Sequence, residues 1–292
     1  MLDAALNGLT DRRDIRARTV AVLSDARAEA MRAIEAGLAS HPRAARETVR
    51  AIASLTDGIV IATHHVATVW LHPQRSQSEA ERLAVLGVGG YGRAEMAPAS
   101  DLDLLFLRSS KATPRGEQVI QFVLYVLWDL GAKVGSAVRS VEECLSLSRT
   151  DMTVRTTLLE ARPLAGDEAL AQLMIGRFRD MVSKSDPRPF IAAKMAERDV
   201  RLQKTGAVRY RVEPNVKDGK GGLRDLQTLY WIGKYIHQVD RAIELVDLGL
   251  FTREEHTTFW AAEDFLWAVR CQLHLAAGRA ADKLSFDMQL EV

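Results

Sequence analysis

Two aspartates at alternate positions, Asp101 and Asp103, open the short apolar run DLDLLFL. Side chains alternate faces along a β-strand, so the two carboxylates would project from one face, about 7 Å apart at Cα. Like charges this close repel, and both stay ionised most readily when a divalent cation lies between them. Oxygen ligands of this kind favour Mg²⁺, which also bridges substrate phosphates. The pair therefore predicts a magnesium site.

A glycine-rich segment, GVGGYG at residues 87–92, precedes the pair and formally matches the dinucleotide-binding pattern GxGxxG. A Rossmann unit, however, needs a crossover helix of about three turns after the glycines. Asp101 follows Gly92 by only nine positions, and Pro98 lies between them. The spacing therefore excludes a Rossmann crossover.

The spacing fits a glycine turn, one short helical turn over residues 93–96, and then a strand. Glycine backbones let phosphate oxygens approach the N–H groups closely, and Arg93 can add a charge-assisted contact. Glycine turn and aspartate pair together predict a site for a nucleoside triphosphate with Mg²⁺. The alternative is a surface turn followed by an edge strand with solvated acids. A lone DxD would favour that alternative, but its combination with the glycines between two apolar strands favours the site.

Periodicity predicts the elements that position these residues. Helices are expected over 11–38, 42–71, 119–130, 167–182, 187–205, 223–237 and 253–277. Strands are expected over 83–90, 101–107 and 133–139, with a polar linker over 73–79. Capping boxes are expected at Ser140 with Glu143 and at Thr252 with Glu255. The middle of the chain therefore mixes strands and helices, and the part beyond residue 165 is helical.

A second glycine-rich segment, residues 215–222, leads directly into the helix that begins at Leu223. Such a segment offers N–H groups and a positive dipole end to an anion. Residues 194–224 carry nine Lys or Arg against four Asp or Glu, so the basic excess is local. Lys217, Lys220 and Arg224 are candidates to reach a triphosphate. The alternative is an exposed loop with ordinary solvated lysines.

Composition excludes several classes of protein. A hydrophobic fraction of 47% and a charged fraction of 26% are ordinary for a folded chain, and the net charge of +1 gives no global attraction to nucleic acid or anionic membranes. The two cysteines, Cys144 and Cys271, show no zinc-ligand spacing. The first residues lack a signal-peptide core, and the apolar stretches are interrupted before about 18 residues. We therefore expect a cytoplasmic protein that binds neither nucleic acid nor membrane.

At its glycines and aspartates the chain resembles the polymerase-β-like nucleotidyltransferase superfamily. The fuller string GVGGYGRAEMAPASDLDLLFL resembles one branch of it, the PII uridylyltransferases. EPNVKDGKGGLRDLQTLYWI, residues 213–232, is similar to the signature that follows the transferase domain in that family. The resemblance covers about residues 80–292. It implies an α+β fold in which a nucleotidyltransferase domain with a small mixed sheet (79–165) is flanked by an N-terminal helical region (1–78) and followed by a helical domain (166–292).

The resemblance also implies an activity, the Mg²⁺-dependent transfer of UMP from UTP to a tyrosine hydroxyl of the PII signalling protein, in nitrogen regulation. Asp101 and Asp103 would bind the metal and act in catalysis. The nucleotide would contact Gly89, Gly90, Arg93, Ser100, Lys217 and Arg224. Two alternatives stay open: a nucleotidyltransferase with another acceptor, and a nucleotide-binding module without catalysis.

A third carboxylate is usual in the superfamily, often as the base that accepts the acceptor's proton. Glu160 is the first candidate, because its run LLEARPLAG can form a further strand beside the pair, although a surface salt bridge to Arg162 would also explain it. Asp129 is the weaker candidate, since Gly131 marks it as a helix end. Ser136 stands where the family is expected to show histidine, so any role for that position is in doubt.

Family members are longer, with an HD-type domain that removes the uridylyl group and two ACT domains that sense glutamine. This chain has no His-Asp doublet. It therefore resembles a fragment, from which transfer but neither uridylyl removal nor glutamine sensing is expected.

Overall fold

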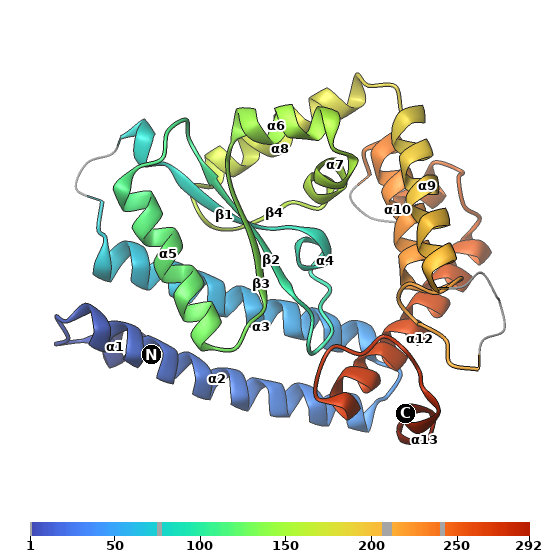
Figure 1. Cartoon of the computed structure of the whole chain (residues 1–292), viewed down its shortest axis with the longest axis horizontal. Helices are drawn as coiled ribbons and strands as arrows, with labels where there is room; N and C mark the ends of the chain where they lie inside the picture. Colours follow the sequence, from blue (N-terminus) through green and yellow to red (C-terminus); the bar gives the residue numbers. More distant parts are fainter. Residues whose placement is uncertain (1, 75–77, 206–211, 240–242) are drawn as a thin grey trace. The chain divides into compact units, whose positions relative to one another are not determined.

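The structure, a computed structural model, describes residues 2–74, 78–205, 212–239 and 243–292 (Figure 1). The chain forms two compact units, each assembled from several stretches. The first comprises Met1–Gly37, Arg50–Met96 and Ser100–Arg177, and the second comprises Leu38–Val49, Ala97–Ala99 and Phe178–Val292. The N-terminal helices and the segment before the aspartate pair therefore contribute to the second unit as well as to the first.

The first unit contains a four-stranded mixed sheet, which confirms the predicted α+β fold. Its strands, in the spatial order β3-β2-β1-β4, are β1 (Leu83–Gly87), β2 (Leu102–Arg108), β3 (Val134–Ser140) and β4 (Arg162–Gly166). Strand β1 is antiparallel to β2 and β4, and β2 is parallel to β3. Gly87 pairs with Leu104, so the C-terminal end of β1 lies beside the N-terminal end of β2.

Helices cover one face of this sheet, and the apolar side chains of β1 and β2 on that face are buried among them (Figure 1). The core cluster joins side chains of the sheet, such as Val85 and Phe106, to side chains of the covering helices, such as Ile52 and Val123. The covering helices are α1 (Leu2–Leu6), α2 (Arg12–Ser40), α3 (Ala45–His65) and α5 (Pro114–Asp129). The burial of apolar area here stabilises the strand that carries the aspartates at its N-terminal end.

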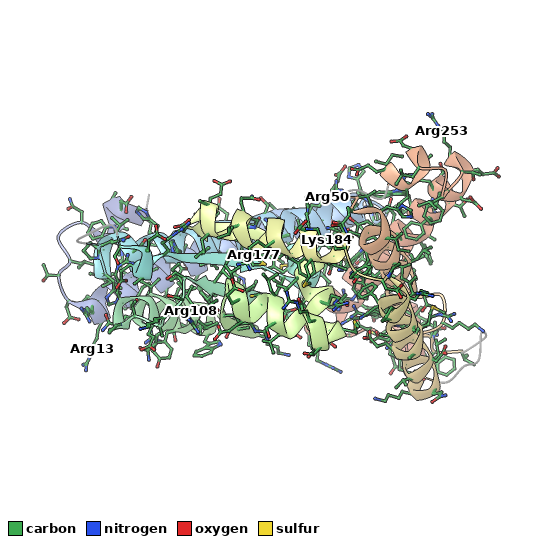
Figure 2. The ribbon with its side chains drawn as sticks, turned by 90° about the horizontal axis from the view of Figure 1, so that it is seen from above. Arg13, Arg50, Arg108, Arg177, Lys184 and Arg253 are labelled. Carbon is green, nitrogen blue, oxygen red and sulfur yellow. The ribbon has the colours of Figure 1, made fainter. Side chains whose placement is uncertain are left out.

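Two consecutive helices, α6 (Val141–Thr150) and α7 (Met152–Leu159), link β3 to β4. The predicted capping box at Ser140 and Glu143 is present at the start of α6. Buried Arg155 closes the corner, because its guanidinium donates to the carbonyls of Ser148 and Arg149 at the end of α6. Arg108 and Arg177, labelled in Figure 2, lie at the surface and pair with Glu143 and Glu142.

A π-helix, η1 (Val66–Leu71), continues α3. Contrary to our expectation, Ala45–Leu71 is long and apolar enough, by length and composition alone, to cross a membrane. Its buried side chains, among them Val60 and Val66, belong to the core cluster of the first unit. Part of the apolar character of this segment therefore serves packing inside the protein.

His64, near the end of α3, gives the fold a pH dependence. Burial, with Arg115 and His65 adding positive charge, lowers the pKa of His64 to about 4. In the unfolded chain the imidazole titrates near pH 6.5. The contribution of neutral His64 to the free energy of unfolding is therefore fully present above that pH and is lost as the pH falls towards 4, by about 3 kcal/mol in all. Urea unfolding at pH 7, 6 and 5 should show a weaker pH dependence for His64→Gln than for wild type. The exposed His41→Gln serves as the control, and equal slopes for all three proteins would contradict this role.

The second unit is helical. Its helices are α9 (Arg188–Thr205), α10 (Leu223–His237), α11 (Glu244–Asp247), α12 (Arg253–Ala277) and α13 (Phe286–Glu291), while α8 (Glu168–Ser183) spans the boundary. Both α10 and α12 match their predicted bounds, and α12 has the predicted capping box and ends at Gly278 in the left-handed region. The core of this unit includes Leu38, Ala45, Val49, Ala97, Leu223, Trp267, Ala268 and Cys271.

Candidate active site

The glycines after β1 form a short helical turn, α4 (Gly89–Gly92). The predicted helical turn over residues 93–96 is wrong: the turn begins four residues earlier, and Ala94 leaves it with a φ of 59°. Inside the turn the N–H groups of Gly92 and Arg93 donate to the carbonyls of Val88 and Gly89, at 3.0 and 3.2 Å. The turn's own i to i−4 bonding thus leaves out the N–H groups of its first residues.

The end of this turn is packed too closely for a side chain at Gly92. A Cβ on Gly92 would lie 2.0 Å from the carbonyl oxygen of Glu160 and 2.9 Å from that of Gly87. Gly89 has a φ of 59°, which favours glycine. The geometry of the turn therefore requires glycine at position 92 and favours it at position 89, whereas a Cβ on Gly90 would make only ordinary contacts, at 3.5 Å or more.

Asp103 lies directly against this turn. Its carbonyl accepts the N–H of Val88 at 3.1 Å. Its carboxylate oxygens lie 3.3 Å from the position of a Cβ on Gly89 and 2.6 Å from that of a Cβ on Gly135. The carboxylate therefore occupies space that two glycines leave open, one on each side.

Gly135 is a further residue of the site, one that the motifs of the sequence do not single out. It lies on β3 opposite Asp103 in the parallel register. The signal was the glycine in KVGSAVR, but only the pairing of β3 with β2 shows that this glycine makes room for the carboxylate.

Asp101 directly precedes β2, and both aspartates are exposed, whereas Leu102 and Leu104 are buried. This alternation agrees with the expected projection of both carboxylates from one face. Among the described residues no group of three or more His, Cys, Asp or Glu is arranged to hold a metal. A pair of carboxylate ligands fits Mg²⁺, which keeps several waters and takes its other oxygens from substrate phosphates.

Arg93, directly after the turn, is fixed by two carboxylates. Its Nε donates to Glu95 at 3.0 Å, and its Nη1 donates to both oxygens of Glu160 at 2.7 Å. Burial by itself would lower the pKa of Arg93, but Glu160 and Glu95 outweigh it and raise the pKa. The remaining nitrogen, Nη2, lies 3.6 Å from the position of a Cβ on Gly90. The guanidinium is thus held beside the glycines.

Glu160 occupies a different place from the one we expected. It is the C-cap residue that directly follows α7, and β4 begins only at Arg162. Its side chain is 1% exposed and paired with Arg93, so the predicted surface salt bridge to Arg162 is wrong. The pairing follows from burial, because a buried carboxylate requires a partner. The other candidate, Asp129, ends α5 and pairs with Arg16 at the surface.

The second glycine-rich segment lies in the second unit and is shaped by Asn215. Its side-chain oxygen accepts the N–H groups of Lys217 and Asp218, at 3.0 and 2.6 Å. Two of the three predicted cations, Lys217 and Arg224, have partners within their unit. Lys217 lies 3.7 Å from a carboxylate oxygen of Asp282, and Arg224 lies 3.7 Å from one of Asp218.

Asp282 joins this segment to α12. Arg270 donates to its carboxylate at 2.7 Å, and His274 lies within 3.4 Å. Burial works to raise the pKa of Asp282, but His274, Arg270 and Lys217 outweigh it and hold the pKa well below its ordinary value. The other ring nitrogen of His274 accepts the N–H of Ala99 at 3.2 Å.

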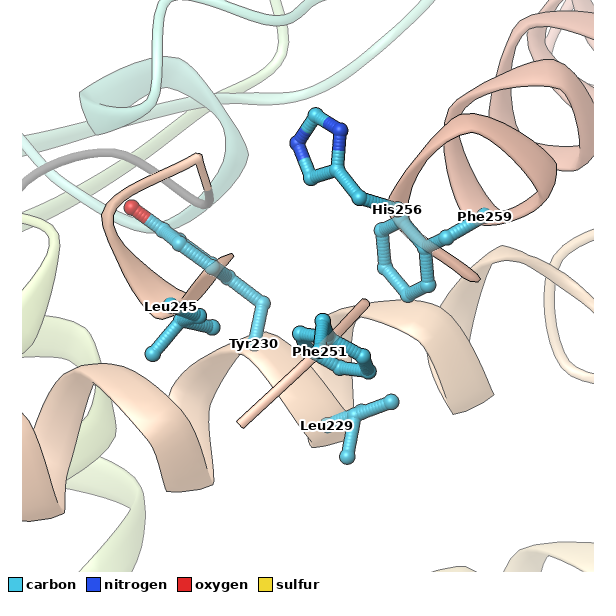
Figure 3. A pocket seen from close by; sticks show the side chains of 6 residues that line it. All are labelled: Leu229, Tyr230, Leu245, Phe251, His256 and Phe259. Atoms are coloured by element: carbon cyan, nitrogen blue, oxygen red, sulfur yellow. The ribbon is translucent and has the colours of Figure 1, made fainter. Parts of the chain in front are cut away.

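A small apolar pocket of the second unit contains none of the predicted site residues (Figure 3). It is lined by Leu229, Tyr230, Leu245, Phe251, His256 and Phe259. Its lining carries no carboxylate, lysine or arginine, so its chemistry does not suit a nucleotide phosphate.

Two family models match separate parts of the chain. Residues 189–292 match the model described as GlnD PII-uridylyltransferase, and residues 4–157 match the model described as glutamate-ammonia ligase adenylyltransferase. The second match contains the glycine turn and the aspartate pair.

Curated relatives are similar over nearly the whole chain. Bifunctional uridylyltransferase/uridylyl-removing enzymes are 53% identical in Cereibacter sphaeroides over 100% of this chain, 52% in Ruegeria pomeroyi over 97%, and 47% in Caulobacter vibrioides over 99%. The chain spans 31% of the length of each of these relatives. On these similarities the chain belongs to the PII-uridylyltransferase family of nucleotidyltransferases.

Proposed function

We propose that the chain transfers UMP from UTP to a tyrosine hydroxyl of the PII signalling protein, with Mg²⁺, and so acts in nitrogen regulation. The acceptor oxygen forms a bond to the α-phosphorus, the bond from that phosphorus to the bridging oxygen breaks, and pyrophosphate leaves. The proposal rests on one observation: the Asp103 carboxylate lies between Gly89 and Gly135, beside the glycine turn. The names of the relatives supply the nucleotide.

Asp101 and Asp103 would hold Mg²⁺, which when bound neutralises phosphate charge and polarises the α-phosphorus. The N–H groups of Gly89 and Gly90 would bind phosphate oxygens, since glycine has no side chain of its own to keep the nucleotide away. Arg93 would add positive charge beside Gly90, and Ser100 would contact the nucleotide next to the pair. Catalysis would rest mainly on positioning and charge neutralisation.

Glu160 enters the proposal through Arg93. Both of its oxygens accept from that guanidinium, which favours anchoring Arg93 over accepting a proton from the acceptor. The binding of a triphosphate by Lys217 and Arg224 stays a prediction from the sequence. Each of these cations already has a carboxylate partner, Lys217 with Asp282 and Arg224 with Asp218. Binding of a triphosphate would therefore require an exchange of partners.

A second candidate is the transfer of AMP from ATP to another protein. It is favoured by the match of residues 4–157 to the adenylyltransferase model, which contains the same glycines and aspartates. The two candidates share the site and differ in base and acceptor.

Labelled nucleotide distinguishes them. The chain is incubated with Mg²⁺, PII and either α-labelled UTP or α-labelled ATP, and protein-bound label and pyrophosphate are measured. We expect label from UTP on PII, none on PII whose acceptor tyrosine is replaced by phenylalanine, and loss of at least about 100-fold when EDTA removes the metal. Label from ATP alone would support the second candidate. UTP binding without pyrophosphate release would leave a binding module and refute both.

A further inference from the structure

Arg162, the first residue of β4, joins the glycine turn to α3. Its Nη1 and Nη2 donate to the two oxygens of Asp57 at 2.8 and 3.0 Å. Nη2 also donates to the carbonyl of Tyr91 at 3.1 Å, and Nε donates to that of Gly92 at 3.2 Å. One guanidinium therefore holds a side chain of α3 and two carbonyls of α4 at the same time.

This arrangement depends on the shape of arginine. The planar guanidinium offers five N–H donors in a fixed fork, whereas lysine offers one flexible point charge. Asp57 takes the two terminal nitrogens and fixes the plane of the fork. The donors that remain then point at the carbonyls of Tyr91 and Gly92. Lysine in this place would keep the charge and lose the fork.

The position of Arg162 in the chain adds to the effect. Two residues earlier, Glu160 binds Arg93, which directly follows the turn, and its carbonyl is the atom that leaves no room for a Cβ on Gly92. The ring of Tyr91 also lies against Arg162, with its centroid 5.5 Å from Cζ. The segment from Glu160 to Arg162, which leads into β4, thus fixes the end of the glycine turn through its side chains and its backbone.

We propose that Arg162, oriented by Asp57, is a positioning residue that sets the glycine turn against Asp103 for the binding of nucleotide phosphate. This inference rests on the proposed function, because it takes the glycine turn to be the part of the site that binds phosphate. Arg162 acts through the carbonyls of Tyr91 and Gly92 and is not itself a phosphate ligand. A shift of about 1 Å in such a turn can cost about 100-fold in rate.

The chain offers a matched control. Arg82 and Asp167 form a pair of the same kind, with Nε and Nη2 donating to the two carboxylate oxygens at 2.6 and 3.1 Å. The side chains are 26% and 26% exposed, close to 30% and 22% for Arg162 and Asp57. Arg82 precedes β1 and Asp167 follows β4, so this pair lies at the opposite end of the same two strands.

The test compares Arg162→Lys and Asp57→Asn with Arg82→Lys and Asp167→Asn in the 292-residue chain. Melting temperature, kcat and KM for UTP, and equilibrium binding of UTP with Mg²⁺ are measured. We expect Arg162→Lys to lower kcat/KM for UTP by about 10- to 100-fold, mainly through KM. Arg82→Lys, at a similar loss of melting temperature, should stay within about twofold of wild type. The double variant of Arg162 and Asp57 should lose less than the product of the two single losses, because both act on one turn.

Equal kcat/KM for Arg162→Lys and Arg82→Lys would overturn the positioning role while leaving the proposed function intact. If wild type transfers no UMP, the proposed function fails, and the binding measurement decides the inference alone. Weaker UTP binding by Arg162→Lys than by Arg82→Lys would still support it. Equal binding, or no binding by wild type, would end it.

Discussion

Replacing Asp101 and Asp103 together by asparagine is expected to lower the rate of UMP transfer by about 10³-fold or more. Asparagine keeps the size of the side chain but removes the negative charge that holds a divalent cation. Because both aspartates are exposed, the folded state should keep its stability. Relief of the repulsion between two neighbouring carboxylates acts in the same direction.

A second double variant controls for the loss of two charges. Asp25→Asn with Glu29→Gln removes two exposed acids from α2 and should leave transfer unchanged. Initial rates are measured with α-labelled UTP over a range of Mg²⁺ concentrations, with circular dichroism to confirm folding. Equal labelling of PII by wild type and by the aspartate variant would remove the basis of the assigned activity.

Gly92→Ala is expected to lower the free energy of unfolding by about 3 kcal/mol and to abolish nucleotide binding. The new Cβ would lie 2.0 Å from one backbone oxygen and 2.9 Å from another. Neither oxygen can move as a side chain would, so the turn must move away from the backbone of Glu160 and of Gly87. That separation would also pull apart the contacts that Arg93 and Arg162 make there.

Gly176→Ala supplies the comparison. A Cβ on Gly176, in α8, meets nothing within 4 Å, so alanine should stabilise that helix by about 0.5–1 kcal/mol. Urea unfolding of both variants gives the free energies, and titration with UTP gives binding. Similar stabilities for the two variants would show that the turn has more freedom than its packing allows.

Local signals predicted most of the regular elements. The capping boxes at Ser140 and Thr252 were visible in the sequence because capping involves residues three apart. Strands β1, β2 and β3 were visible as short apolar runs, and α10 and α12 as periodic ones. The glycines and the aspartate pair were visible as well, because their spacing lies within one turn and one strand.

Partners distant in the sequence could not be predicted. Glu160 and Arg93 are 67 residues apart, and no local pattern favours this pairing over the neighbouring Arg162. The role of Gly135 required the register of β3 against β2. The end of the helical turn at Gly92 is followed by Ala94 in a left-handed conformation, which alanine rarely adopts and which no local pattern predicts.

Ala97–Ala99, between the glycine turn and Asp101, belongs to the second compact unit. There Ala97 is buried with Leu223 and Trp267, and Ala99 is bonded to His274. The polypeptide therefore leaves one folding unit and returns to it within a few peptide bonds. Truncation of the gene near Arg177 is therefore not expected to yield an intact first unit. Ala97–Ala99 would stay with that fragment and would lose the residues of the second unit that bury Ala97.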